Sequence, residues 1–415
     1  MDRDDLIHDW NHANSQDLPW SRPVELNDET LRDGLQSPSV TDPSIEDKIR
    51  LLHLMHGLGI ATADVGLPGA GPRAVQDVTR LCQEIVDSKL DFRPNCAART
   101  VLADVRPCVE ISQKVGIPVE VCAFIGSSPI RIFAEGWTVD RMLQTSEEAV
   151  RFCVREGLPV MFVTEDTTRA DPETLKALYG NAIEWGAQRI CLSDTVGHAT
   201  PEGARALVRF VKEEIVAPSG ESVKVDWHGH NDRGLGLANA LAAIEAGVDQ
   251  VHGTALGMGE RVGNVQMDLL LVNLTLAGAH DADLTLLPEY CRIASEACQV
   301  PVPCTYPVVG SDAFRTATGV HAAAIIKAEA KGATWLADRI YSGVPASLVG
   351  RSQEIEISPM SGLSNVKYWL KSRGLNAEDE DLCARIFNTA KASNHTLSEV
   401  EVLAIVNSTR SAAAQ

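Results

Sequence analysis

Eight short runs of β-type residues, separated by stretches with helical periodicity, repeat between residues 24 and 255. The runs begin at Val24, Thr62, Asp91, Val119, Val160, Arg189, Val223 and Asp249. The stretches between them, such as CVEISQKVG and RGLGLANALAAIEAG, carry apolar residues at helical spacing and often end at glycine, the usual residue after a helix. Alternating strands and helices imply a parallel sheet, and eight repeats in about 230 residues favour a (β/α)8 TIM barrel over an open doubly wound sheet.

Polar and reactive side chains follow the strands of this predicted barrel, at the points where each run passes into its helix. They are Asp28, Arg32, Asp33, Asp64, Asn95, Cys122, Glu165, Asp166, Asp194, Thr195, His228, His230, His252 and Thr254. In TIM barrels the carboxyl ends of the strands form the catalytic face. A single polar residue at a strand end means little, but eight strand ends in register predict an active site there.

After residue 285 the alternation stops, and PVPCTYPVVG is typical of a proline-rich connector. The remainder is predicted to be helical, and Thr396 with Glu399 fits a capping box at the start of the last helix. We therefore expect an N-terminal extension (1–21), a catalytic barrel (22–285), a linker subdomain carrying His321 (286–345) and a mainly helical subdomain (346–415).

The charge balance restricts the partners of the chain. Lys and Arg number 37 against 56 Asp and Glu, a net charge of −19. A nucleic-acid binder needs a basic stripe to displace counterions, so we expect no nucleic-acid partner. No uncharged apolar run reaches the ~18 residues of a membrane span, and the acidic, polar start does not resemble a secretory signal. The ten cysteines lack the spacing of a disulfide framework, which predicts reduced thiols and a cytoplasmic location.

His228, Gly229 and His230 end the seventh run, and because strand side chains alternate, both imidazoles should point to the same side. Two neutral imidazoles form half of a site for a divalent metal, and Asp33 is the first candidate for the carboxylate that would complete it. In most proteins, a His-x-His pair forms hydrogen bonds within a loop. Here the presence of Asp33 at the end of the first predicted strand favours the metal site instead. Arg32 beside Asp33 offers a fork of donors for a carboxylate or a developing oxyanion, or a salt bridge at the barrel rim.

Two further features are weaker signals. Residues 257–264, GMGERVGN, are glycine-rich but lack nucleotide-binding spacings, so a tight active-site loop is the better interpretation. His321 lies outside the predicted barrel, where a surface histidine without a catalytic role is the more common case.

Four segments of the chain together resemble one known family. LNDETLRDGLQSPSV resembles the first-strand signature of the DRE-TIM metallolyases. HGHNDRGLGLANALAAIEAGVDQVHGTALGMGERVGN is similar to the second signature of their acyl-CoA-condensing branch, the 2-isopropylmalate, homocitrate and citramalate synthases. SDTVGHATP and PVVGSDAFRTATGVH also resemble that branch, so the similarity runs from residue 22 to 415.

The resemblance implies a set of roles. It places a divalent cation (Mg, Mn, Co or Zn) on Asp33, His228, His230 and Asn264. It implies that Arg32 steadies an enolate or alkoxide and that Glu165 and His321 transfer protons, with His321 coming from the exchanged C-terminal arm of a partner in a homodimer. The expected substrate contacts are Gln36, Asp64, Cys122, Thr195 and Thr254. A metal held by only one carboxylate, together with Arg32, is expected to make the site locally positive on an acidic surface.

The implied reaction is a Claisen condensation of acetyl-CoA with a 2-oxo acid, followed by thioester hydrolysis to a 2-alkylmalate. A 2-isopropylmalate synthase type is favoured, and homocitrate, citramalate and 2-benzylmalate synthases stay open. Leu35 and Cys122 depart from the usual synthase residues, and RDGLQ also occurs in 3-hydroxy-3-methylglutaryl-CoA (HMG-CoA) lyases, a different class; the GERVGN loop favours a synthase. The chain is expected to lack the C-terminal leucine-regulatory domain of regulated relatives.

Overall fold

The computed structural model describes residues 6–12 and 19–413, and the chain divides into two compact units, Met1–Pro301 and Val302–Gln415. The expected N-terminal extension, residues 1–21, falls in large part outside the described residues. The two units are described separately below.

The first unit is a closed barrel of eight parallel strands arranged in chain order, with the last strand paired to the first. This confirms the predicted (β/α)8 TIM barrel. Each strand begins within one of the eight predicted runs, and the third and fourth strands extend two residues beyond theirs. The strands are β1 (Glu25–Asp28), β2 (Thr62–Asp64), β3 (Arg93–Arg99), β4 (Glu120–Gly126), β5 (Val160–Glu165), β6 (Arg189–Asp194), β7 (Lys224–Gly229) and β8 (Gln250–Gly253).

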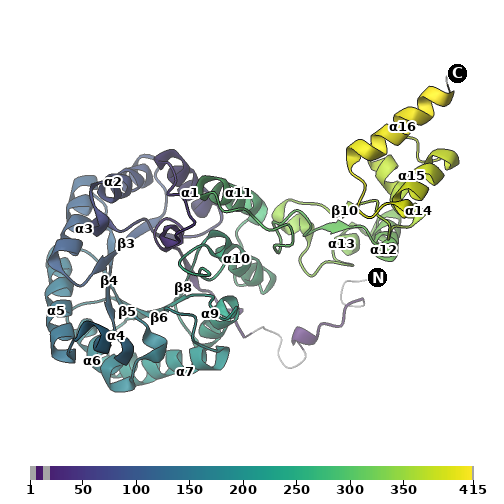
Figure 1. Cartoon of the computed structure of the whole chain (residues 1–415). Coiled ribbons are helices and arrows are strands. Elements are labelled where there is room, and N and C mark those ends of the chain that lie inside the picture. The colour runs from purple at the N-terminus through teal and green to yellow at the C-terminus, as the bar shows by residue number, and fades with distance from the viewer. Residues whose placement is uncertain (1–5, 13–18, 414–415) are drawn as a thin grey trace. The chain divides into compact units, whose positions relative to one another are not determined.

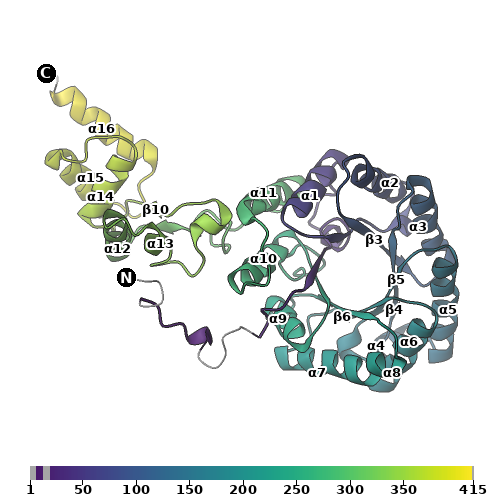
Figure 2. The ribbon, with the colours of Figure 1, turned by 180° about the vertical axis from the view of Figure 1, so that it is seen from behind.

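Helices surround the barrel as a continuous outer ring, as Figure 1 shows, and Figure 2 shows the same ring from behind. They are α1 (Ile45–Gly57), α2 (Pro72–Asp87), α3 (Leu102–Val115), α4 (Pro129–Glu135), α5 (Val139–Arg155), α6 (Pro172–Glu184), α7 (Pro201–Val211), α8 (Ala217–Ser219), α9 (Gly236–Ala246), α10 (Met267–Leu276) and α11 (Leu287–Cys298). The barrel was expected to end at residue 285, but the first unit continues through α11 to Pro301.

Local sequence signals explain where these helices begin and end. Gly116 and Gly247, which close two of the predicted helical stretches, adopt left-handed φ angles of 83° and 103° at the ends of α3 and α9. At the other end, the hydroxyl of Ser44 accepts a hydrogen bond from the backbone of Asp47 at the start of α1. These caps fix the lengths of the helices that return the chain to the next strand.

The second unit contains two separate hydrophobic cores. One gathers Ala322, Ile325, Ala328, Ala337 and Ile355, and the other is centred on Trp369, Leu370 and Ile386. The elements are β9 (Arg315–Thr316), α12 (Gly319–Ala330), α13 (Thr334–Ala337), β10 (Glu354–Ile355), α14 (Leu363–Ser372), α15 (Glu380–Ala392) and α16 (Glu399–Ala413). The unit is therefore mainly helical, with one short parallel strand pair.

The capping box of the last helix differs from the predicted one. Ser398, not Thr396, bonds reciprocally with the residue three positions on: its backbone N–H donates to Glu401 Oε2 over 2.7 Å, and the Glu401 N–H donates to Ser398 Oγ over 3.3 Å. The sequence satisfies the S/T-x-x-E pattern twice, two residues apart, and the pattern alone could not choose between them.

In the part of the chain that the structure describes, no helix combines the length and apolar character that crossing a membrane requires.

Candidate active site

A cavity of about 510 Å³ lies at the carboxyl ends of the barrel strands. Residues from all eight strands or the loops that follow them line it, and they include most of the predicted site residues. The predicted residues at its wall are Arg32, Asp33, Gln36, Asp64, Cys122, Glu165, Thr195, His228 and His230. The barrel thus brings together side chains that are up to about two hundred positions apart in sequence.

Asp33 and the two histidines form one buried cluster. His228 lies on β7 and His230 follows it, so alternation directs both rings inward. Asp33 begins the 3-10 turn after β1, and its Oδ2 lies 3.4 Å from His228 Nε2 and 3.3 Å from His230 Nε2. Gly229 between them lies in a tight space, where a Cβ would lie 3.0 Å from the indole nitrogen of Trp227.

This donor set fits a divalent cation. Asp33 Oδ2 is buried and has no hydrogen-bond partner among the described residues, although two imidazole nitrogens face it. Asp33, His228 and His230 can each present one ligand atom within 4.8 Å of the others. One carboxylate and two imidazoles suit several first-row divalent metals. A cation would satisfy the oxygen that the protein leaves unpaired.

Arg32 is held beside this cluster by three carboxylates. Its Nε donates to Asp64 Oδ2 over 2.8 Å and its Nη1 to Asp33 Oδ1 over 3.0 Å, and Nη2 pairs with Glu29. Burial lowers the pKa of Arg32, but the three carboxylates raise it well above its usual range, so the guanidinium stays charged. The predicted positive charge of the site includes the charge of a bound metal, so it stays a prediction; among the described residues, three carboxylates contact the guanidinium of Arg32.

Glu29 and His252 are also part of the cluster; Glu29 was not singled out in the sequence, and His252 was named at a strand end without a specific role. Glu29 Oε1 accepts from His228 Nδ1 over 3.2 Å and from His252 Nδ1 over 2.6 Å. Burial lowers the pKa of His228, but Glu29 and Asp33 outweigh it and raise that pKa to about 10. The alternation of side chains along the first strand could have identified Glu29 in the sequence. Asn27 and Glu29 share the inner face, while Asp28 points outward and bonds to Tyr290.

Glu165 lies on the opposite wall, at the end of β5. Its Oε1 lies 3.2 Å from Arg131 Nε of α4, a short helix that begins at the Ser128 cap. Burial raises the pKa of Glu165 above its usual range, whereas Arg131 lowers it. The neighbouring Thr195 accepts a hydrogen bond from the backbone of Asp166 over 2.8 Å. A partly buried carboxylate with a raised pKa at a cavity wall is the kind of group that can accept a proton, and the predicted catalytic role of Glu165 stays a prediction.

Asn264 and Thr254 do not line the cavity. Asn264 is buried beside His230, its backbone paired in an antiparallel bridge, and its amide nitrogen donates to the carbonyl of Met258 over 3.1 Å. The Thr254 hydroxyl donates to the same carbonyl over 2.6 Å. Both residues therefore support the glycine-rich loop, where a Cβ at Gly263 would lie 1.8 Å from the carbonyl oxygen of Gly257.

His321 belongs to the second unit, at the start of α12. Its exposed ring stacks on Tyr341, with ring centroids 4.0 Å apart and an interplanar angle of 26°. The predicted role of His321 in proton transfer stays a prediction.

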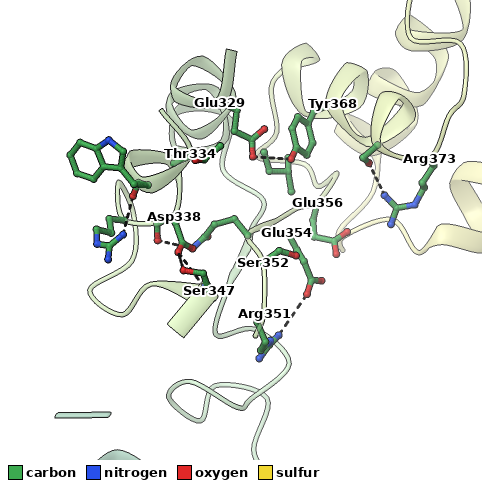
Figure 3. A pocket seen from close by; sticks show the side chains of 16 residues that line it. Glu329, Thr334, Asp338, Ser347, Arg351, Ser352, Glu354, Glu356, Tyr368 and Arg373 are labelled. Atoms are coloured by element: carbon green, nitrogen blue, oxygen red, sulfur yellow. Dashed lines mark hydrogen bonds and ion pairs between the residues drawn. The ribbon is translucent and has the colours of Figure 1, made fainter. Parts of the chain in front are cut away.

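A second cavity, of about 640 Å³, lies within the second unit (Figure 3). Its polar side chains bond to one another: Tyr368 donates to Glu329 over 3.2 Å, and Ser347 donates to Asp338 over 2.6 Å. Arg351 lies 3.6 Å from Glu354. Four carboxylates and three arginines line this cavity, so groups of both charges face it.

The sequence matches the HMGL-like family over residues 23–292. It is 31% identical over 363 residues to a putative (R)-citramalate synthase of Methanopyrus kandleri, covering 86% of this chain and 67% of the relative. It is 30% identical over 392 residues to a 2-isopropylmalate synthase of Sulfolobus acidocaldarius, covering 93% and 96%, and 30% identical over 367 residues to a homocitrate synthase of M. kandleri, covering 88% and 86%.

Among solved structures, the chain is similar to an HMG-CoA lyase of Bacillus subtilis, with a TM-score of 0.57 and 19% sequence identity over 68% of this chain and 96% of that one. At this identity the similarity shows the shared fold.

Proposed function

The chain belongs to the HMGL-like family, and from that premise we propose that it condenses acetyl-CoA with a 2-oxo acid in a metal-dependent Claisen reaction. The observation that carries the proposal is the unpaired Oδ2 of Asp33, which faces two imidazole nitrogens beside the charged Arg32. Relatives named as citramalate, 2-isopropylmalate and homocitrate synthases support the same reaction class.

Asp33, His228 and His230 would hold the metal, with the amide oxygen of Asn264 as a further candidate. When bound, a divalent cation supplies Lewis-acid polarisation of the keto group and fixes the 2-oxo acid. Glu165 removes a proton from the methyl group of acetyl-CoA, and the resulting carbanion forms the carbon–carbon bond at the keto carbon. The keto oxygen takes the electron pair, and Arg32 stabilises the developing negative charge. The alkoxide then takes up a proton to become a hydroxyl group, and water adds to the thioester carbonyl, which leaves a carboxylate and releases free CoA.

The wall opposite the metal cluster supports an apolar 2-oxo acid, and we favour the 2-isopropylmalate synthase type. That wall consists of Leu67, Ala97, Cys122, Phe124, Met161, Val163 and Cys191. None of these side chains can neutralise a second carboxylate, and burying an unpaired charge is costly. The dicarboxylic substrate of a homocitrate synthase would therefore fit poorly, while citramalate and 2-benzylmalate synthases differ from our choice in side-chain size.

The proposal includes a cytoplasmic homodimer in which His321 of one subunit assists proton transfer in the other. The exposed ring of His321 and its stacking on Tyr341 are compatible with a contact made by the second unit. All ten cysteines are free thiols, nine of them buried, which agrees with a reducing compartment.

The test is release of free thiol from acetyl-CoA across a panel of 2-oxo acids, with the purified full-length chain and added Mg²⁺, Mn²⁺, Co²⁺ or Zn²⁺. We expect 2-oxoisovalerate to give the highest kcat/KM and 2-oxoglutarate to give little thiol. A carbon–carbon lyase would instead form acetyl-CoA from HMG-CoA. Cleavage of HMG-CoA without thiol release from any 2-oxo acid would overturn the proposal.

A further inference from the structure

Glu29 lies at the centre of the charged side of the barrel, where it contacts both groups on which the proposed chemistry depends. Its Oε2 pairs with Arg32, and its Oε1 accepts from His228 Nδ1 over 3.2 Å. The side chain is almost completely buried, with 3% of the residue exposed. No other described residue contacts the metal-ligand candidate His228 through Nδ1 and the guanidinium of Arg32 at the same time.

We propose that Glu29 is a positioning residue, which holds the imidazole of His228 and the guanidinium of Arg32 in one fixed arrangement. The inference rests on the proposed function, because the roles of His228 and Arg32 come from it. Glu29 itself touches neither substrate nor metal in this assignment.

The contact with His228 determines which ring nitrogen is available. When Nδ1 carries the proton and donates it to Glu29, Nε2 presents a lone pair. Nε2 is the atom that lies 3.4 Å from Asp33 Oδ2, within the cluster that fits a cation. A carboxylate that binds the far side of a metal-ligating histidine fixes both the tautomer and the ring orientation.

The contact with Arg32 fixes the second group through the other oxygen of the same carboxylate. Arg32 also bonds to Asp33 and Asp64, so its guanidinium is held from three directions. Because Glu29 bridges His228 and Arg32, a movement of one would displace the other. The metal ligand and the group that stabilises negative charge therefore keep a constant separation during the reaction.

A chain of buried groups keeps Glu29 in place. His252 Nδ1 donates to Glu29 over 2.6 Å, and the other ring nitrogen of His252 lies 3.1 Å from Asp226 Oδ2. Arg189 in turn donates to Asp226 Oδ1 over 2.6 Å and pairs with Glu25 at the start of β1. The support for Glu29 thus extends along the barrel interior toward the amino ends of the strands.

One alternative uses the same atoms. Glu29, His228 and His252 can also present ligand atoms within 4.8 Å of one another, so a second cation could replace the protons between them. In that case the protein would bind two metal ions per chain. A positioning role requires one.

The experiment compares the full-length wild type with Glu29→Gln and the matched control Asp28→Asn. Asp28 is the adjacent buried carboxylate, but it faces outward and bonds to Tyr290 and the backbone of Thr30. Metal-free protein is titrated with Mn²⁺ by calorimetry, and the Co²⁺ form is followed by its visible absorption. We expect one ion per chain, affinity about 10–100-fold weaker in Glu29→Gln, an altered Co²⁺ spectrum, and a change within about twofold in Asp28→Asn.

A second variant, Glu29→Asp, keeps the negative charge in the barrel but shortens the side chain. We expect it to fold and to bind Mn²⁺ with an affinity between those of the wild type and Glu29→Gln. Three outcomes would each overturn the positioning role. The first is wild-type affinity and spectrum in both Glu29 variants, and the second is an equal loss of affinity in Glu29→Gln and Asp28→Asn. The third is binding of two ions per wild-type chain. The metal titration does not depend on turnover. If the wild type released no thiol, the proposed function would be refuted, but the titration would still show whether Glu29 positions His228.

Discussion

The two halves of the barrel contribute chemically different side chains to the cavity. Strands β7, β8, β1 and β2 and the loops after them contribute charged and imidazole side chains. Strands β3 to β6 contribute mainly apolar side chains, namely Ala97, Cys122, Phe124, Met161, Val163 and Cys191. Because the barrel is closed, the two halves face each other across one cavity. In the proposed function, the charged half would hold the head group that 2-oxo acids share, and the apolar half would select among their side chains.

The physical state of each half follows from burial. In the charged half each buried carboxylate has a cationic or donor partner, which lowers the pKa of Asp33 and Glu29 despite desolvation. In the apolar half burial raises the pKa of the Cys122 and Cys191 thiols well above their usual range. Those thiols stay neutral and act as small apolar groups. Burial therefore has different consequences in the two halves. In the charged half the buried groups are paired and ionised, and in the apolar half the buried thiols are neutral.

The sharpest test of the charged half is His228→Ala, for which we expect the largest effect. Removing one imidazole from the Asp33–His228–His230 cluster should abolish thiol release and Mn²⁺ binding, because two ligand atoms cannot hold the cation against water. The substitution also removes the imidazole that contacts both Glu29 and Asp33, although Arg32 still pairs with both carboxylates. Circular dichroism should still report the barrel.

His198→Ala is the matched control for this variant. His198 is exposed after β6 and does not line the cavity. It should retain wild-type turnover and metal affinity. Wild-type activity in His228→Ala would show that the charged half does not carry the metal.

Cys122→Leu tests the apolar half and should have an intermediate effect. The larger side chain reduces the space opposite the metal cluster, so kcat/KM for 2-oxoisovalerate relative to pyruvate should fall about 10–200-fold, as for other changes of a few methyl groups in a pocket. Mn²⁺ affinity should not change, because no metal-ligand candidate contacts the thiol, which bonds to Asn95 over 3.4 Å. Steady-state kinetics and the metal titration together separate the two halves.

Cys304→Leu makes the same substitution at an exposed position. Its selectivity should equal that of the wild type. If Cys122→Leu also left the ratio unchanged, or weakened the metal instead, the division of labour between the halves would be wrong.

The sequence predicted these two halves unequally. The periodic strands predicted the barrel, and the signature segments predicted Asp33, His228 and His230, because charged residues at strand ends stand out against an apolar background. Met161 and Cys191 look like any core residues in the sequence, and Cys122 was predicted as a substrate contact with help from the family resemblance. Only barrel closure, which sets β3 to β6 opposite β7 to β2, makes them a wall.

Glu165 lies in the apolar half, and changes to the charges around it should have the smallest effect on activity, a shift in its pH dependence. The groups that set its pKa, after burial, are Arg131, Asp166, Glu135 and Glu260. A base must be ionised, so activity falls as pH drops through the pKa of Glu165. Arg131→Gln removes the cation that favours the carboxylate, which raises this pKa further. The acidic limb of kcat/KM should therefore move to higher pH, by up to about one unit for a partly exposed pair.

Glu135→Gln, on the same helix as Arg131, should shift the acidic limb of kcat/KM in the opposite direction. Glu135 lies 3.3 Å from Arg131 and raises the pKa of Glu165, so its removal should move the acidic limb to lower pH. Both displacements should shrink in high salt, because the pairs are partly exposed and screened. Profiles of kcat/KM against pH for the two variants check this. If both limbs coincided with that of the wild type, the titrating base would have to be sought outside the apolar half, with the second unit's His321 as the next residue to test.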